Sequence, residues 1–345
     1  QAVTERKAVA GHMVILDARN GEILALANQP SFNPNNRGDY KGDHFRNRAV
    51  TDLFEPGSTL KPFTIAAGLE SGNYTPTTLI DTGPGRFKVG RHVVRDIHNY
   101  GSLDVSGIIE KSSNVGATKI ALSLEAEQFW GMLNGVGFGQ ITGVELPGEP
   151  QGRLAEPAHW RQIEQATLAF GYGLSVTAVQ LARAYGALAN GGMLQGVSIL
   201  KQGKPAPGVR VMSETTALAV REMLRLVVQR GTGKAAAVTG YQVGGKTGTV
   251  HKSTEGGYAE KEYLSLFAGF IPVSEPRLIG VVIIDGPQGA EYYGGLVAAP
   301  VFGAVMHEAV RILNIAPDAD INAEDPTVRL AGWTKAAAPA AGQVQ

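Results

Sequence analysis

Apolar and polar residues alternate near both ends of the chain, which is the pattern of half-buried β-strands. Residues 13–30, MVILDARNGEILALANQP, contain two apolar runs on either side of Asn20-Gly21. This dipeptide accepts the positive φ angles of a two-residue turn, so the segment predicts a β-hairpin. Later in the chain KTGTV, YLSLFAGFI and RLIGVVIID predict three further strands, at residues 246–250, 263–271 and 277–285.

Between these strands, apolar residues recur with the spacing of amphipathic helices. The predicted elements are a helix from Ser58 to about Gly72, short strands and turns over 73–102, mostly helical sequence over 103–191, a helix over 213–229 capped by Ser213, and a last helix over 299–315. Strands at both ends with helices between them predict an antiparallel sheet closed by distant segments. This is an α+β fold with a helical insert.

The composition is that of a globular protein, with 43% apolar and 18% charged residues. The formal net charge is zero and no basic run occurs, so we expect no nucleic acid partner. The absence of cysteine excludes thiol nucleophiles, disulfides and thiolate metal sites. The seven histidines show no metal-ligand spacing, and we expect neither a metal nor a cofactor.

The two ends of the sequence are polar. The chain opens on Gln1 rather than on a methionine, and no run of about 18 apolar residues predicts a signal peptide or membrane span. We therefore expect a piece of a longer protein. The residues from about 317 onward are rich in Ala, Asp and Pro, which predicts a loose tail.

Residues 240–247, GYQVGGKT, fit the phosphate-loop pattern GxxxxGK[ST]. A phosphate loop follows a buried strand and opens a helix whose N-terminus favours the anion. Here GKAAAV precedes the match, and Thr-Gly-Thr-Val follows Lys246, which favours a strand over a helix. A P-loop NTPase is therefore a distant alternative. A lysine among small residues on an edge strand is better suited to bind a carboxylate.

The sequence PGSTLKPF places Ser58 and Lys61 three residues apart at the start of a helix. Positions i and i+3 lie on one helical face, so the lysine amine can reach the serine hydroxyl. The alternative role of Ser58 is helix capping. A second SxxK match, Ser198 to Lys201, lies in a strand-like stretch where the two side chains would point to opposite faces, so we expect Ser198 to be structural.

A third motif is SSN, with Ser112 and Asn114 between two helical segments. Helix capping is again the alternative role. The pattern SxN also occurs at residues 31–33 and 71–73. Only the SSN copy falls between the SxxK motif and the later KTGT, so it is the candidate for a shared site.

The three motifs in this order resemble the signatures of penicillin-binding proteins and serine β-lactamases. They are Ser58-Thr-Leu-Lys61, Ser112-Ser-Asn114 and Lys246-Thr-Gly-Thr249. Longer segments are similar to the division-type class B penicillin-binding proteins, which are septal peptidoglycan transpeptidases. These segments are RNRAVTDLFEPGSTLKPF, EKSSNVGATKIAL, FGYGLSVTAVQLARAYGALANGG and YYGGLVAAPVFGAVM. The resemblance covers about residues 10–316.

The resemblance implies the penicillin-binding protein/serine β-lactamase-like transpeptidase fold, a five-stranded antiparallel sheet flanked by helices plus an all-helical subdomain. We expect a transpeptidase domain over residues 1–316, with a helical part at about 58–235 inserted between the sheet strands, and a loose tail over 317–345. The parent protein is expected at the periplasmic face of the bacterial inner membrane, anchored by an N-terminal helix that precedes this sequence.

The resemblance also implies roles for the motif residues. The implied catalytic residues are Ser58, Lys61 and Ser112, and the implied substrate-binding residues are Asn114, Lys246, Thr247, Gly248, Thr249, Tyr263, Tyr292 and Tyr293. The backbone N–H groups of Ser58 and Thr249 would form the oxyanion hole. Burial and the charge of Lys246 would keep Lys61 neutral, as a base must be. Gly248 would leave room for a ligand extended along the strand edge.

Two further sets of residues have weaker signals. Tyr263, Tyr292 and Tyr293 are expected to form walls of the cleft, with ordinary packing as the alternative. His98 near Asp96 suggests a Ser-His-Asp arrangement, but no GxSxG turn accompanies it. We therefore expect this pair to be structural.

The implied function is that of a serine D,D-transpeptidase that cross-links peptidoglycan stem peptides at the division septum. β-Lactam antibiotics would acylate Ser58, and division-machinery membrane proteins would contact the full-length protein. A D,D-carboxypeptidase and a β-lactam-sensing domain share these motifs and stay open as alternatives. A β-lactamase is disfavoured, because the Glu-x-x-Leu-Asn pattern of class A enzymes is absent around Glu156 and Glu164.

Overall fold

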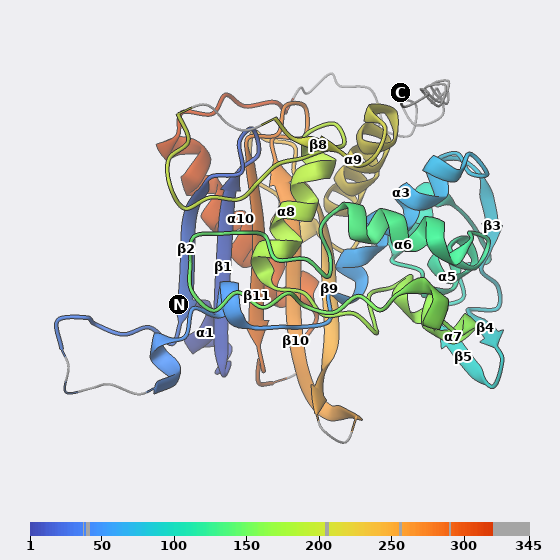
Figure 1. Cartoon of the computed structure of the whole chain (residues 1–345), viewed down its shortest axis with the longest axis horizontal. Helices are drawn as coiled ribbons and strands as arrows, with labels where there is room; N and C mark the ends of the chain where they lie inside the picture. Colours follow the sequence, from blue (N-terminus) through green and yellow to red (C-terminus); the bar gives the residue numbers. More distant parts are fainter. Residues whose placement is uncertain (37, 39–41, 204–206, 255–256, 290, 320–345) are drawn as a thin grey trace.

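A five-stranded antiparallel sheet, in the order β2-β1-β11-β10-β9, forms the centre of the molecule (Figure 1). Its strands are β1 (Ala10–Asp17), β2 (Ile23–Gln29), β9 (Gly244–Thr254), β10 (Gly257–Ile271) and β11 (Leu278–Asp285). The computed structural model describes residues 1–36, 38, 42–203, 207–254, 257–289 and 291–319. The predicted hairpin and the three later strands are present, so the expected α+β class is confirmed.

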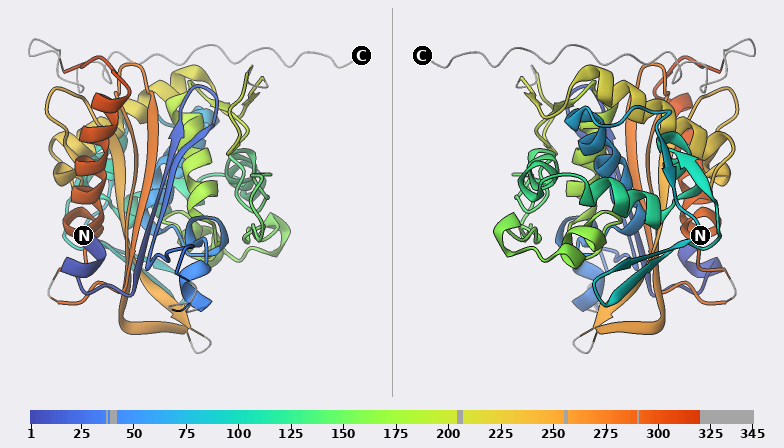
Figure 2. Two further views of the ribbon diagram at one scale, coloured as in Figure 1. Left: turned by 90° about the vertical axis from the view of Figure 1, so that its left-hand side faces the viewer. Right: turned by 90° about the vertical axis from the view of Figure 1, so that its right-hand side faces the viewer.

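Helices cover both faces of the sheet (Figures 1 and 2). On one face α10 (Gly294–Ile312) packs on β10 and β11, and on the other α8 (Ala178–Ala189) packs on β11 and β1. Alternate residues of β1 therefore enter two cores, with Met13 on the α10 side and Val14 on the α8 side. Because both faces are covered, all eight residues of β1 are buried.

The start of α10 differs from the prediction. The helix begins at Gly294 rather than at Ala299, and Pro300 lies inside it. A proline in a helix leaves the carbonyl four residues earlier without its N–H partner. Here that carbonyl belongs to Leu296, and it accepts a hydrogen bond from Arg6 Nη2 at 3.1 Å. α10 is long and apolar enough to cross a membrane, but its apolar face belongs to the core.

The segment between β2 and β9 folds mainly into helices beside the sheet. The further helices are α1 (Ala2–Glu5), α2 (Arg48–Thr51), α3 (Lys61–Ser71), α4 (Val105–Lys111), α5 (Asn114–Leu122), α6 (Ala126–Gly135), α7 (Gln162–Leu168) and α9 (Glu214–Gln229), and the 3-10 turns are η2 (Gly42–Phe45), η3 (Gly57–Leu60), η4 (Pro157–His159) and η5 (Lys234–Ala236). Ser213 caps α9 through a hydrogen bond from Thr216 N, as predicted.

The part expected to be all-helical also contains three small strand pairs. They are β3 (Leu79–Asp81) with β6 (Ser102–Asp104), β4 (Arg86–Val89) with β5 (His92–Arg95), and β7 (Met193–Leu194) with β8 (Val209–Arg210). The short strands expected over residues 73–102 are thus found. The pair β7–β8 was not predicted, because a two-residue strand leaves no periodic signal.

The first residues of the segment expected to be a loose tail are held against the end of the sheet. Asp318 accepts hydrogen bonds from the backbone N–H groups of Gln242, at 2.7 Å, and of Ser274, at 3.1 Å. The chain is therefore still attached to the end of the sheet at residue 318. Residues 320–345 of the predicted tail lie outside the described residues.

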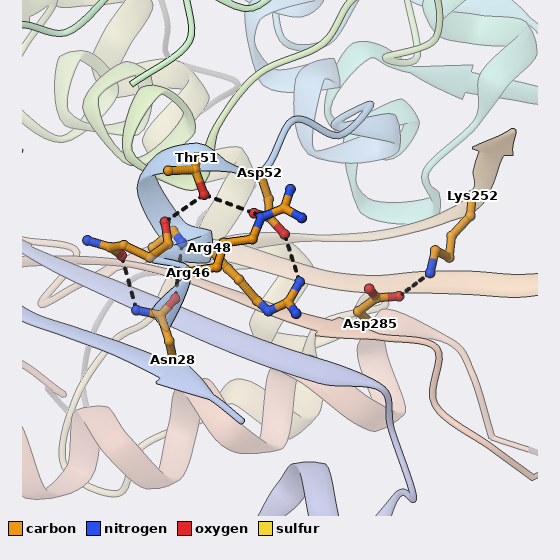
Figure 3. A network of polar contacts seen from close by, with 9 residues as sticks. Asn28, Arg46, Arg48, Thr51, Asp52, Lys252 and Asp285 are labelled. Carbon is orange, nitrogen blue, oxygen red and sulfur yellow. Dashed lines mark hydrogen bonds and ion pairs between the residues drawn. The ribbon is translucent and has the colours of Figure 1, made fainter. Parts of the chain in front are cut away.

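A polar network lies between α2 and one end of the sheet (Figure 3). Asp52 forms ion pairs with Arg46 at 2.6 Å and with Arg48 at 3.1 Å. Beside it His12, on β1, is buried, and neither of its ring nitrogens has a hydrogen-bond partner in the part of the chain that the structure describes. Desolvation is the main cause that lowers the pKa of His12 to about 4, because the charged imidazolium would lose its hydration.

This burial predicts acid sensitivity. The unfolded chain takes up a proton near pH 6.5 that the folded His12 excludes until about pH 4, so stability falls as the pH drops through this window. At 1.36 kcal/mol per pH unit the loss is about 3 kcal/mol. We expect His12→Leu to remove this part of the pH dependence in urea unfolding at pH 7 and pH 4.5. The exposed His307 on α10 supplies the control variant His307→Leu; equal pH dependence in wild type and His12→Leu would refute the assignment.

Candidate active site

Ser58 lies in η3, directly after a sharp turn at Gly57. Gly57 has a φ of +53°, and its N–H donates to the carbonyl of Gly171 at 3.1 Å. A Cβ on Gly57 would lie 2.2 Å from Val250 Cγ1, so only glycine fits between this turn and β9. The Ser58 hydroxyl caps no helix and instead lies 3.0 Å from Lys61 Nζ, within hydrogen-bond distance.

The side chain of Lys61 is fully buried, and its amine contacts three residues. Nζ donates to the backbone oxygen of Ser112 at 2.6 Å and to Oδ1 of Asn114 at 2.7 Å, atoms that can only accept. The hydroxyl oxygens of Ser58 and Ser112 each lie 3.0 Å from Nζ. A neutral amine has two N–H donors and one lone pair. Its donors can satisfy the two obligate acceptors, which leaves the lone pair for a hydroxyl proton.

The surroundings favour the neutral form of this amine. Desolvation lowers the pKa of Lys61 well below its ordinary value, the charge of Lys246 lowers it further, and only the more distant Asp96 opposes them. No described carboxylate forms an ion pair with Lys61. The expected causes, burial and the second lysine, are therefore both present.

Ser112 and Asn114 meet Lys61 at the junction of α4 and α5. Ser112 adopts a left-handed conformation with φ 61° and ψ 39°, which is uncommon for a residue other than glycine. This conformation directs both its carbonyl and its hydroxyl toward Lys61. The amide of Asn114 is oriented because Nδ2 donates to the carbonyl of Arg95 at 3.0 Å, which leaves Oδ1 for the lysine.

Asp96 holds this junction in place, although the sequence did not identify it as a site residue. Its carboxylate accepts hydrogen bonds from the Ser113 hydroxyl at 2.6 Å and from the backbone N–H groups of Asn114 and the following residue, at 2.5 and 3.0 Å. A carboxylate at the N-terminus of α5 is also favoured by the helix dipole. Asp96 lies 17 residues before Ser113, so no local pattern signals the contact.

β9 carries the KTGT motif on the edge of the sheet. Lys246 is fully buried and donates to the carbonyl of Thr247 at 3.1 Å, and burial lowers the pKa of its amine to about 7. The Thr247 hydroxyl contacts the hydroxyl of Thr232 at 2.8 Å. The Thr249 hydroxyl accepts from the N–H of Gly294, the first residue of α10, at 2.9 Å. Both threonines are thereby held in fixed orientations.

The structure gives Gly248 a packing role that was not expected. A Cβ there would lie 3.1 Å from Thr59 Cγ2 and 3.2 Å from the carbonyl of Pro56. These atoms belong to the turn that carries Ser58. The missing side chain of Gly248 therefore lets β9 pack against that turn, and its role beside a ligand stays a prediction.

The phosphate-loop alternative is not supported. β9 begins at Gly244 and continues as a strand through Lys246 to Thr254. No helix starts after the lysine, so the N-terminal helix dipole and the ring of backbone N–H groups that bind phosphate are not formed. Ser198, the serine of the second SxxK match, has a structural contact: its hydroxyl donates to Glu145 Oε1 at 2.8 Å. It lies in an isolated β-bridge to Glu22 rather than in the expected strand.

A cleft of about 700 Å³ lies where these elements meet. It is lined by five of the eight predicted motif residues, Ser58, Ser112, Asn114, Thr247 and Thr249, while Lys61, Lys246 and Gly248 lie behind its surface. Tyr263, Tyr292 and Tyr293 form one wall. Tyr263 and Tyr292 stack at 4.1 Å between ring centroids, and Tyr292 and Tyr293 at 4.6 Å. The structure thus brings all three tyrosines into the cleft.

Several cleft residues have no signal in the sequence. Tyr172, Thr232 and His251 line the cleft although none belongs to a predicted motif. His98 also lines it, and its ring packs edge-on against Tyr100 at 5.9 Å. No hydrogen bond joins His98 to Asp96 within the described residues, so a Ser-His-Asp arrangement is not formed.

A serine held against a buried lysine, facing an edge strand that carries a second lysine, defines a serine acyltransferase of the penicillin-binding type. Residues 11–307 match the family model of the penicillin binding protein transpeptidase domain. The chain therefore belongs to this family.

The chain is also similar to named relatives and to solved structures of this family. The chain is 45% identical to the probable peptidoglycan D,D-transpeptidase PenA of Neisseria meningitidis, over 94% of this chain and 55% of that protein. It is 40% identical to the peptidoglycan D,D-transpeptidase FtsI of Escherichia coli, over 92% of this chain and 54% of that protein. The apo structure of the TP domain from Burkholderia pseudomallei penicillin-binding protein 3 matches with a TM-score of 0.85 at 44% identity, covering 92% and 93% of the two chains. The chain thus spans about half the length of these two named relatives.

The contact between Gly171 and Gly57 makes a testable prediction. A Cβ on Gly171 would lie 2.1 Å from the Gly57 carbonyl oxygen, so Gly171→Ala must displace the turn before Ser58. Gly173 has the same backbone strain, with a φ of +88° against +87°, but a Cβ there meets only Thr167 Oγ1 at 3.9 Å. Both alanine variants should lose about 1–2 kcal/mol of unfolding free energy from the positive φ alone.

Only Gly171→Ala should also slow labelling by a fluorescent penicillin, by about ten- to a hundredfold, since a shift of about 1 Å in a reacting group can cost about a hundredfold. Equal labelling rates for the Gly171→Ala and Gly173→Ala variants would show that this contact does not position Ser58.

Proposed function

We propose that this chain is a serine D,D-transpeptidase. Ser58 attacks the carbonyl between the two D-alanines that end a peptidoglycan stem peptide, and β-lactams acylate the same hydroxyl. The observation that carries the proposal is the fully buried Lys61 amine, 3.0 Å from Ser58 Oγ and lowered in pKa. Membership of the transpeptidase family and the names of the relatives support the substrate class.

In the first step the lone pair of Lys61 takes the proton of Ser58 as Oγ bonds to the carbonyl carbon. The resulting oxyanion accepts hydrogen bonds from the backbone N–H groups of Ser58 and Thr249. When the tetrahedral intermediate collapses, the C–N bond breaks and the leaving D-alanine amine takes up a proton. Ser112 passes this proton from Lys61, because its hydroxyl lies 3.0 Å from Nζ and faces the cleft.

In the second step the amine of another stem peptide attacks the acyl carbon. It gives one proton to Lys61, and Lys61 then passes this proton to the departing Ser58 oxygen. The peptide bond of the cross-link replaces the ester, so atoms and protons balance over the cycle. Asn114, fixed by Arg95 and lining the cleft, is placed to hold the amide of the donor.

The KTGT strand binds the terminal carboxylate of the donor. Thr247 and Thr249 line the cleft, and Lys246 lies directly behind them. A carboxylate placed there would favour the charged form of Lys246 and accept from the threonine hydroxyls. The outer edge of β9 can pair with an extended peptide as an added strand, which places the scissile carbonyl near Ser58.

The residues of the cleft favour transfer to an amine over hydrolysis. Among the described residues that line it, none is an aspartate or a glutamate. A β-lactamase or an efficient carboxypeptidase needs a group that activates water toward the acyl-enzyme, and a carboxylate commonly serves as this base. We therefore infer slow deacylation by water. The carboxypeptidase stays the second candidate, because it uses the same first step.

The name of one relative supports a proposal for the cellular setting. FtsI of Escherichia coli is named a peptidoglycan D,D-transpeptidase, and the chain covers about half of it. We propose that the whole protein acts at the division septum, on the periplasmic face of the inner membrane, held there by an N-terminal helix. Division-machinery membrane proteins are its proposed partners through the remaining part of the protein.

A fluorescent penicillin tests the proposal. We expect one covalent adduct per chain, located on the peptide that contains Ser58 by mass spectrometry. Ser58→Ala should form none, and Lys61→Met should react at least about a hundredfold more slowly, the usual contribution of a general base. Ser198→Ala, which removes the serine of the second SxxK match, should react like wild type. An adduct that persists in Ser58→Ala would refute the assignment.

The burial of Lys246 predicts a gain in stability when it is replaced. Between pH 10.5 and about 7 the unfolded lysine is protonated and the folded one is neutral, so the penalty grows as the pH falls through this window. It reaches about 5 kcal/mol by pH 7 at 1.36 kcal/mol per unit. Met fills a similar volume without a charge, although the hydrogen bond to Thr247 is lost.

Lys246→Met should therefore raise the free energy of unfolding by about 2–4 kcal/mol at pH 7, with the gain shrinking toward pH 10. Urea unfolding at both pH values measures it. A gain that is absent, or that does not depend on pH, would show that burial of the charge is not the cause.

A further inference from the structure

The β4–β5 hairpin presents an unusual concentration of positive charge. Arg86, Lys88 and Arg95 lie on its outer face, because they alternate with residues that point inward, and Arg91 lies in the two-residue turn. All four side chains are exposed. The sequence as a whole has a formal net charge of zero, so this hairpin is a local excess rather than part of a basic protein.

Two of these arginines lie directly opposite each other. Arg86 pairs with Arg95 in the antiparallel register, which places their Cβ atoms about 5 Å apart. Like charges at such positions destabilise a sheet. Neither arginine forms an ion pair within the described residues, and the nearest carboxylate along the strand, Asp96, is occupied at the start of α5. A repulsive pair that the fold leaves uncompensated fits a surface that binds an anion.

The β4–β5 hairpin is packed against the helical part of the protein and does not project freely into solvent. Its inner face carries Val89 and Val94, which are buried in a cluster with Val115 of α5 and Ala166 of α7. Lys119 of α5 lies over the ring of Phe87 at 5.3 Å and adds a further cation beside the hairpin. The charged outer face is therefore held in one orientation relative to α5. Figure 1 shows the hairpin at the far end of the helical part, next to α7.

The chain leads directly from the β4–β5 hairpin to the cleft. β5 ends at Arg95, whose carbonyl orients the Asn114 amide, and the next residue, Asp96, holds the SSN junction. Ile97 and His98, which follow, line the cleft. A ligand that leaves the cleft along this wall therefore meets the cationic face of the hairpin.

We propose that the outer face of the β4–β5 hairpin is a second binding site, which takes carboxylates of neighbouring stem peptides on the glycan strand whose donor stem occupies the cleft. This inference rests on the proposed transpeptidase function. Each uncleaved stem ends in a carboxylate, and the paired arginines can bind such a group through two parallel hydrogen bonds each. The site holds the polymer near the cleft and takes no part in the chemical step.

An acidic protein segment would fit the same charges. The glycan strand is favoured because the hairpin continues the cleft wall, so both sites can bind one polymer at once and raise its local concentration. A separate protein partner could bind these charges at any distance from the cleft. The experiment below separates the two.

The test is co-sedimentation of the chain with purified peptidoglycan sacculi. Arg86→Gln/Lys88→Gln should weaken binding about three- to tenfold and reduce its dependence on salt, as expected for two exposed ionic contacts. Arg86→Lys, which keeps the charge without the planar fork of arginine, should lose less affinity. Lys201→Gln/Arg311→Gln removes two exposed charges elsewhere and should bind like wild type. Sacculi with amidated carboxylates should bind wild type and the glutamine variant equally.

The rate of labelling by a fluorescent penicillin should be the same in all these variants, because penicillin occupies only the cleft. This separates the two proposals: no labelling of the wild type would refute the transpeptidase function itself. Equal binding of the glutamine variant and wild type to untreated sacculi would overturn the second site. If that variant instead lost only its binding to polyglutamate, the hairpin would be a site for an acidic protein, which also overturns the proposal.

Discussion

Two buried lysine amines, without a carboxylate partner for either among the described residues, are the constraint on which this structure depends. Burying a charged amine is unfavourable, so each lysine is stable in the folded protein mainly as a neutral base or with a bound anion. Lys61 on α3 and Lys246 on β9 come from different halves of the chain. Burial lowers the pKa of both amines, and the charge of Lys246 lowers that of Lys61 further. The proposed chemistry uses one lysine as a base and the other as an anion site.

The rest of the fold keeps these two amines close to each other and away from solvent. Gly57, Gly171 and Gly248 lack side chains where a Cβ would separate the Ser58 turn from β9 or from the backbone at Gly171. Asp96 fixes the start of α5, and with it the carbonyl and amide that accept from Lys61. The sheet, buried on both faces, holds β9 rigidly at its edge. The positions of Ser58, Lys61 and Lys246 therefore depend on backbone packing as much as on the side chains of the motifs.

The sequence predicted the parts that depend on local spacing. The i and i+3 positions of Ser58 and Lys61, the hairpin at Gly21 and the alternation in β9, β10 and β11 are all short-range patterns. The contact of Asp96 with α5 could not be predicted, because it joins residues 17 positions apart through a loop. The start of α10 was misplaced because Pro300 resembles a first-turn residue, while its cost is relieved by Arg6 from the other end of the chain. The packing role of Gly248 could not be predicted, because its neighbours, Pro56 and Thr59, are distant in sequence.

The central claim is that burial and the second lysine keep the Lys61 amine neutral. The most direct measurement is an NMR titration of the chain with 13C-labelled lysine side chains, in which the Lys61 signal is assigned by its loss in Lys61→Met. The account predicts that Lys61 titrates well below 10.5 and that its pKa rises when Lys246 is replaced by methionine. A Lys61 amine that titrates at its ordinary value, unchanged by Lys246→Met, would contradict it.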